Sequence, residues 1–138
     1  MSEKWFNWYV KQVSKEKQWA TYRDRFLCPC CFMPTLDERC GYEICPICFW
    51  EDDGQDTDDA NVVRGGPNHD YSLQEARENF EKYNTMYRPS DKDAFERENK
   101  SMDIKLQMYK AFCKAIKSRS ERDWENALKI EDKYYKRS

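Results

Sequence analysis

The chain has 138 residues, enough for one domain of ordinary size with an appended helical segment. Only 14 residues are Leu, Ile or Val, whereas 21 are Trp, Tyr or Phe, so we expect a small, aromatic core. The net charge of −2 hides an acidic middle between two basic arms: residues 1–27 carry +3, residues 28–99 carry −10 and residues 100–138 carry +5. A core this poor in aliphatic residues needs a further crosslink, for which seven cysteines are available.

The composition argues against several classes of protein. No apolar run approaches the length of a membrane span, and we expect no membrane partner. The first residues lack the apolar stretch of a secretory signal, which predicts a cytoplasmic protein with reduced thiols. Seven cysteines cannot all pair internally, so metal binding is favoured over disulfides. The sequence has no phosphate-binding loop or nucleophile elbow, and its single histidine, His69, lies in a polar loop, so we expect no enzyme.

The hydrophobic spacing of the first half predicts a helix followed by a short hairpin. Apolar residues at helical intervals predict helix over residues 2–26, with a break near Ser14 as the alternative. Two short strands, residues 35–39 and 42–45, are expected to pair through a turn at Gly41. Residues 51–70 follow as a loop rich in Asp, Gly and Asn.

Capping motifs open the helices of the second half. The capping box Ser72-Leu73-Gln74-Glu75 predicts a helix to about residue 86. A similar start at residues 90–93 predicts a long helix to about residue 118, and Ser120 is expected to cap a last helix that turns Trp124, Leu128 and Tyr135 to one face. We therefore divide the chain into a helical segment, a cysteine-rich domain and a helical extension packed on that domain: residues 1–26, 27–86 and 87–138.

The sharpest signal is a pair of Cys-Pro-x-Cys motifs separated by 13 residues. Two such knuckles, held face to face by a hairpin, direct four sulfurs at one point and form a tetrahedral site for Zn²⁺, although iron fits the same ligands. Four protein ligands leave no open position, so the site is expected to be structural. The predicted metal ligands are Cys28, Cys31, Cys45 and Cys48.

The other cysteines have simpler interpretations. Cys30 lies within the first knuckle, where it is a less favoured substitute ligand. Cys40 is expected to be a free surface thiol, and Cys113 a core residue of a helix. A Cys-Pro-x-Cys motif is also used for dithiol redox chemistry, but that use needs one motif at the start of a helix, whereas two motifs flank a hairpin here.

The cysteine motifs and the segments around them resemble the bacterial cysteine-rich CPCC proteins over residues 27–83. The matching segments are residues 28–31, 35–39, 41–56, 66–68 and 72–80. The resemblance implies an α+β fold in which a small zinc-ribbon-like or rubredoxin-like knuckle hairpin packs with several α-helices. The family usually has Gly after the first motif, where this chain has Phe32, so we expect the first knuckle to turn differently. Members resemble bacterial proteins found near toxin genes, which favours an immunity role.

Acidic side chains are concentrated directly after the second knuckle. The spacing does not fit an EF-hand, because counting back from Gly54 puts Phe49 in the first ligand position. A solvated loop is the simplest interpretation, and a surface for a basic partner is the functional one. The predicted partner-binding residues are Glu51, Asp52, Asp53, Asp56, Asp58 and Asp59.

These observations favour a zinc-stabilised protein-interaction module. We expect an intracellular immunity protein whose acidic surface occupies the phosphate site of a nuclease-like toxin. The alternative is a nucleic-acid-binding zinc ribbon that uses the basic N- and C-terminal helices. The acidic middle of the chain argues against that alternative, since nucleic-acid readers carry their basic patch at the site. A thiol-redox protein is the third candidate.

Overall fold

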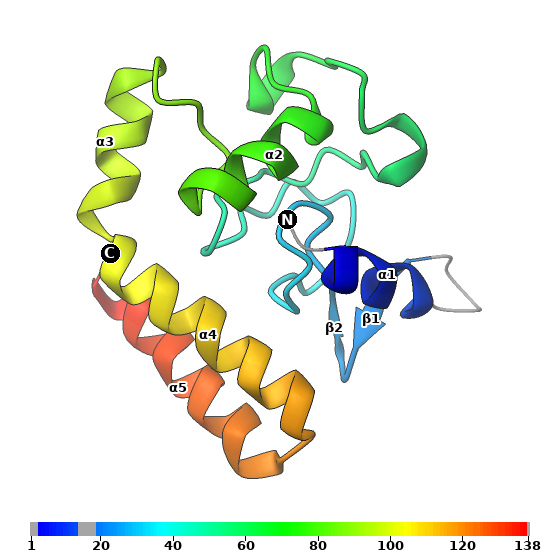
Figure 1. Cartoon of the computed structure of the whole chain (residues 1–138), viewed down its shortest axis with the longest axis vertical. Helices are drawn as coiled ribbons and strands as arrows, with labels where there is room; N and C mark the ends of the chain where they lie inside the picture. Colours follow the sequence, from blue (N-terminus) through cyan, green and yellow to red (C-terminus); the bar gives the residue numbers. More distant parts are fainter. Residues whose placement is uncertain (1–2, 14–18, 138) are drawn as a thin grey trace. The chain divides into compact units, whose positions relative to one another are not determined.

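The structure is a computed structural model that describes residues 3–13 and 19–137 (Figure 1). The chain divides into two compact units, Met1–Arg88 and Pro89–Ser138, which are described separately. Within the described ranges, every helix is too short or too polar to cross a membrane.

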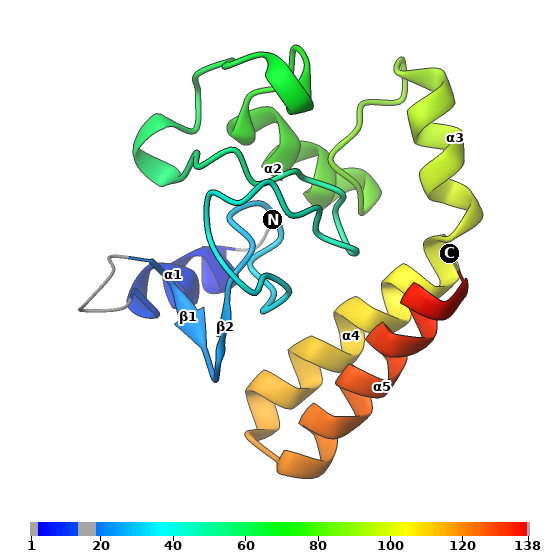
Figure 2. The same cartoon turned by 180° about the vertical axis from the view of Figure 1, so that it is seen from behind.

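The first unit combines two α-helices, a small hairpin and long irregular segments, which confirms the α+β class. Strands β1 and β2 are antiparallel, with Thr21 opposite Phe26, and Arg23 at the turn has a positive φ of 55°. Two 3₁₀ turns, η1 and η2, precede α2 (Figure 2). The elements are α1 (Glu3–Lys11), β1 (Thr21–Tyr22), β2 (Arg25–Phe26), η1 (Thr57–Asp59), η2 (Gly66–Asn68) and α2 (Leu73–Tyr83).

The hairpin does not lie where the sequence predicts it. The predicted helix over residues 2–26 ends at Lys11, and part of its range falls outside the described residues. The predicted strands over residues 35–39 and 42–45 do not pair with each other, because Leu36 bridges to Phe26 and Ile44 bridges to Glu51. Each predicted strand instead flanks one cysteine knuckle: Leu36 follows the first and Ile44 precedes the second. The hairpin that does form, β1–β2, lies before the first knuckle.

Aromatic rings form the core next to α1, as the composition predicts. Phe32 is fully buried and stacks on Tyr9 with ring centroids 4.5 Å apart. Leu27 and Ala20 complete this cluster, and Phe6 packs against it. The helix α1 is thereby attached to the residue that follows the first cysteine motif.

The helix α2 begins at the predicted cap and ends three residues earlier than expected. The Ser72 hydroxyl accepts a hydrogen bond from the Glu75 amide over 3.0 Å, which confirms the cap. The Glu75 carboxylate does not return to the cap residue; it accepts from the Arg88 guanidinium over 2.7 and 2.8 Å. The helix ends at Tyr83 because Asn84 takes a left-handed conformation, with φ of 61°.

The second unit consists of three helices, of which α4 and α5 lie side by side (Figures 1 and 2). The single long helix predicted from residue 90 is broken at Ser101. Phe112 of α4 packs against Trp124 of α5, with ring centroids 5.6 Å apart. The Ser120 hydroxyl caps α5 by accepting a hydrogen bond from the Asp123 amide. The helices are α3 (Lys92–Lys100), α4 (Met102–Ser118) and α5 (Glu121–Arg137).

Two predictions about the faces of these helices are wrong. Tyr135 is 52% exposed, and the buried position on that turn of α5 is Glu131. Cys113 is only half-buried. The interior of the second unit also contains an ion pair that apolar spacing does not predict, formed by Lys105 and Glu98.

Candidate metal centre

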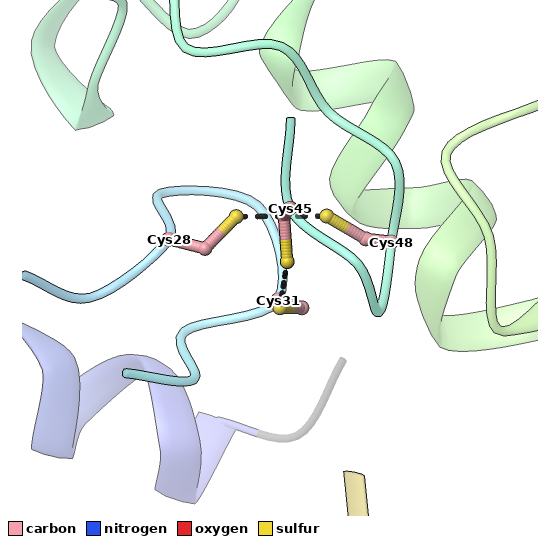
Figure 3. A group of neighbouring side chains, drawn as sticks. All are labelled: Cys28, Cys31, Cys45 and Cys48. Carbon is pink, nitrogen blue, oxygen red and sulfur yellow. Dashed lines mark hydrogen bonds between the residues drawn. The ribbon is translucent and has the colours of Figure 1, made fainter. Parts of the chain in front are cut away.

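The four predicted ligands meet at one point inside the first unit. Their sulfurs all lie within 4.8 Å of one another, and none of the four residues is more than 2% exposed (Figure 3). The Cys28 and Cys48 sulfurs are 3.5 Å apart, and the Cys31 and Cys45 sulfurs are 3.6 Å apart. Each knuckle therefore contributes one sulfur to each close pair.

The two knuckles have the same backbone design. In the first, the Cys28 carbonyl accepts from the Phe32 amide over 2.8 Å, and in the second the Cys45 carbonyl accepts from the Phe49 amide over 2.9 Å. The residue after each motif is left-handed, with φ of 69° at Phe32 and 74° at Phe49. Phe32 thus adopts the conformation that a glycine would favour, and the two knuckles of this chain turn alike.

Hydrogen-bond donors approach the sulfurs from the protein. The Cys30 amide donates to the Cys28 sulfur and the Trp50 amide to the Cys48 sulfur, each over 3.4 Å. The Thr35 hydroxyl donates to the Cys45 sulfur over 3.1 Å. Such donors disperse thiolate charge and orient the ligands around a metal.

The sulfur geometry fits a tetrahedral metal ion. Zinc–sulfur bonds of about 2.3 Å place the sulfurs of a tetrahedron about 3.8 Å apart. The two closest separations, 3.5 and 3.6 Å, are near that value, and all the sulfurs lie within 4.8 Å of one another. They are far longer than a disulfide bond of about 2.05 Å. The four cysteines are therefore positioned to bind a metal ion.

Burial acts to raise the pKa of all four thiols and prevails at three of them. It raises the pKa of Cys28, Cys31 and Cys48 well above the ordinary thiol value. Burial acts in the same direction on Cys45, but hydrogen bonds from the other three thiols and Thr35 outweigh it and lower the pKa of Cys45. Several negative sulfurs in so dry a site need a cation, so metal binding must be coupled to proton release.

The remaining cysteines of the first unit lie outside this group of four. Cys30 is fully buried within the first knuckle, and burial raises the pKa of its thiol. Cys40 is exposed, as predicted, in a left-handed turn with φ of 65°. Neither residue completes the sulfur cluster.

The helix α2 and the residues after it hold both knuckles, a relationship that sequence spacing does not show. The buried Arg77 side chain donates from Nε to the Pro29 carbonyl over 2.7 Å. The Met86 amide donates to the Cys48 carbonyl over 2.9 Å. The sulfur cluster is thus connected to α2 through the first knuckle and to the residues after α2 through the second.

The acidic segment after the second knuckle is largely engaged within the protein. Asp52 is 1% exposed and pairs with Arg39, whose guanidinium also pairs with Asp56 over 2.9 Å. The Tyr9 hydroxyl donates to Asp56 over 2.8 Å. Asp52 and Asp56 are therefore not free carboxylates on a partner surface, because Arg39 pairs with both of them inside the fold and Arg77 lies 3.7 Å from Asp56.

The other predicted partner residues are divided between turn contacts and open surface. Asp53 accepts from the Gln55 amide, and Asp59 pairs with Arg64 over 2.7 Å. Glu51 is half-buried in the bridge to Ile44. Asp58 is exposed and has no ion-pair partner among the described residues. The signal that sequence reasoning missed is Arg39, a single basic residue among the acidic ones.

Comparison with known families agrees with the sulfur geometry. The model of the family described as "Cysteine-rich CPCC" matches residues 26–101. The chain belongs to the cysteine-rich CPCC family. No curated protein and no solved structure matches the chain. In this CPCC protein the matched segment contains both knuckles and α2, and it continues into the second unit.

Proposed function

We propose that the four cysteines hold one zinc ion as a structural centre, and that the first unit is a protein-interaction module. The observation that carries the zinc assignment is the closed set of four buried sulfurs, 3.5 to 3.6 Å apart within each close pair. A site closed by four protein ligands stabilises a fold and offers no position for substrate, so we propose no catalytic role.

Zinc binding supplies the stability that the aliphatic residues do not. Structural zinc contributes roughly 10–16 kcal/mol of apparent binding free energy in small peptides, which is folding free energy where the site does not exist in the unfolded chain. The two knuckles contain no helix or strand, so their shape depends on the ion and on the contacts from α2.

The partner proposed for this module is a protein with a basic surface. The first unit, residues 1–88, carries 16 acidic and 11 basic side chains, and its net charge of −5 accelerates association with a basic partner and favours a correct orientation. An intracellular immunity protein that blocks the phosphate site of a nuclease-like toxin in the cytoplasm fits this charge. The family resemblance to proteins found near toxin genes supports the same role.

Nucleic-acid binding is the second candidate, and the second unit provides the observation that favours it. Exposed lysines follow each other at helical spacing on α4 and again on α5, which suits contact with a phosphate backbone. These lysines are Lys110, Lys114, Lys117, Lys129, Lys133 and Lys136. Two results would favour this candidate. The logarithm of the binding constant for DNA would fall steeply and linearly with the logarithm of salt concentration, and binding would be lost when these lysines are changed to Gln.

The test of the zinc centre uses the full chain. We expect one zinc per chain by native mass spectrometry, and loss of near-ultraviolet circular dichroism when a strong chelator removes it. Protein that contains no metal, melts cooperatively and is unaffected by chelator would contradict the structural zinc. Iron in place of zinc would leave the structural role intact and change only the ion.

The test of the interaction role is co-expression with the product of the neighbouring gene. We expect a complex that survives size-exclusion chromatography, together with rescue of growth if that product is toxic. Absence of both would contradict the immunity role.

A further inference from the structure

A groove lies beside α1, at the point where the acidic loop meets the N-terminal segment. Its volume is about 450 Å³, and the described residues that line it form two walls of different chemistry. One wall is apolar and consists of Tyr9, Val10, Val13, Trp19 and Ala20. The other is polar and comes from residues 54–64.

The apolar wall offers surface that the fold leaves uncovered. Val10 is 48% exposed and Val13 is 45% exposed. Trp19 lies beside them and is half-buried, with the Arg39 guanidinium 4.3 Å from its ring centroid. Each square ångström of apolar surface that a ligand covers here contributes about 25 cal/mol.

The polar wall is negative. It contains three aspartates and one arginine, Arg64, which is already paired with Asp59 over 2.7 Å. Asp56 is paired with Arg39 and Tyr9. Asp58 lines the groove and is exposed, and no ion pair joins it to another residue within 3–13 and 19–137.

The two walls are fixed to each other by the contacts already described. The Tyr9–Asp56 hydrogen bond joins α1 to the acidic loop, and Arg39 pairs with Asp56 while its guanidinium lies over the Trp19 ring. A groove with preformed walls loses little conformational entropy on binding, which favours affinity.

We propose that this groove binds a basic peptide segment of the partner protein, in which an aliphatic or aromatic side chain stands next to a lysine or arginine. The apolar side chain covers Val10 and Val13, and the cationic side chain pairs with Asp58. This proposal deepens the proposed interaction function, since it names the surface and the kind of segment that the module recognises.

The probe for the test is a fluorescein-labelled peptide that alternates lysine and leucine, titrated with the full metal-loaded chain and followed by anisotropy. Asp58→Lys reverses the charge of an exposed residue that lines the groove and is expected to weaken binding roughly tenfold at low salt. The matched control is Glu78→Lys, an equal charge change on the exposed face of α2 and outside the groove, which is expected to change affinity less than about twofold. An equal loss of peptide affinity in Asp58→Lys and Glu78→Lys would overturn the groove assignment.

The apolar wall has its own test. A peptide that alternates lysine and serine is expected to bind roughly fivefold more weakly than the lysine–leucine peptide, and Val10→Ser is expected to abolish that preference. Tyr42→Ser, which removes an exposed apolar side chain outside the groove, is the control and is expected to retain it. A preference unchanged by Val10→Ser would overturn the assignment.

The groove and the interaction function can fail separately. A partner complex that forms and is equally stable with Asp58→Lys and Val10→Ser would overturn the groove proposal while the interaction function stands. Peptide binding that follows the groove variants, without a complex with the neighbouring gene product, would support the groove and overturn the immunity role.

Discussion

The Thr35 hydroxyl donates a hydrogen bond to the sulfur of Cys45 over 3.1 Å. Thr35 is 7% exposed and is separated by ten residues from the ligand it contacts. The same sulfur is the one whose pKa falls below the ordinary thiol value, because hydrogen bonds outweigh the effect of burial. Thr35 therefore helps to keep Cys45 as a thiolate, the form that binds metal.

Removal of this hydroxyl is expected to weaken metal binding without removing a ligand. Thr35→Val keeps the shape of the side chain, and loss of such a donor typically reduces metal affinity by about 10–100-fold. The measurement is competition for zinc against a chromophoric chelator. Thr21→Val, on strand β1, is the control and should retain full affinity. Equal zinc affinities for the two variants would contradict a role of Thr35 at the site.

Loss of one sulfur ligand is expected to unfold the first unit, whereas loss of the exposed thiol is not. Cys45→Ser removes a fully buried ligand and most of the metal-binding free energy. Cys40→Ser changes an exposed side chain and should alter stability by less than about 0.5 kcal/mol. Metal content by mass spectrometry and thermal melting would distinguish the two. Similar melting temperatures would show that the ligands are assigned incorrectly.

The Arg39 guanidinium is expected to contribute more to stability than an exposed arginine. Arg39→Met leaves the buried Asp52 carboxylate without its partner, which costs about 3–5 kcal/mol. Arg64→Met breaks an ion pair whose arginine side chain is 42% exposed, and it should cost less than about 1 kcal/mol. Urea unfolding of the metal-loaded protein measures both. The prediction is wrong if the two variants lose the same free energy of unfolding.

Asp56 is expected to make the protein acid-sensitive. Burial acts to raise the pKa of Asp56, but hydrogen bonds from Arg39 and Tyr9 outweigh it, so the pKa is lowered in the folded state. A lowered folded-state pKa stabilises the protein above the unfolded value of about 3.9, and that stability is lost as pH falls through the folded value.

Comparison of the natural chain with Asp56→Asn isolates this contribution, because acid release of the metal affects both proteins. Between about pH 5 and pH 2 the melting temperature of the natural chain should fall more steeply than that of the variant. If the melting temperatures of the two proteins fall equally with pH across this range, the Asp56 carboxylate does not contribute to stability.

The metal ligands were predictable because their geometry is local. Two residues between paired cysteines suffice to turn both sulfurs to one side, so the spacing around Cys28 and Cys45 carries the information directly. The cap at Ser72 was predictable for the same reason, since the amide it binds is three residues away.

The position of the hairpin was not predictable, because it depends on which strand finds a partner. The segment around Leu36 has the alternation of a strand, but its backbone bonds to Phe26 rather than to the segment around Ile44. Left-handed residues at Cys40 and Tyr42 then interrupt the path between the expected strands.

The burial of the acidic loop was also hidden from sequence reasoning. Asp52 and Asp58 look alike in the sequence, and only the fold brings Arg39 to one and not to the other. Pairing across 13 residues has no periodic signature, so a run of carboxylates suggests solvent exposure even where the structure encloses part of it.

The ring of Phe32 links α1 to the proposed metal centre. Its positive φ is unfavourable for a residue with a side chain, and the closed knuckle maintains that conformation. Tyr9 of α1 stacks on this ring, so we expect release of a bound metal to disrupt the contact between Phe32 and α1. Trp5 and Trp8 lie on the same helix, so we expect their fluorescence emission to change when the metal is bound or released.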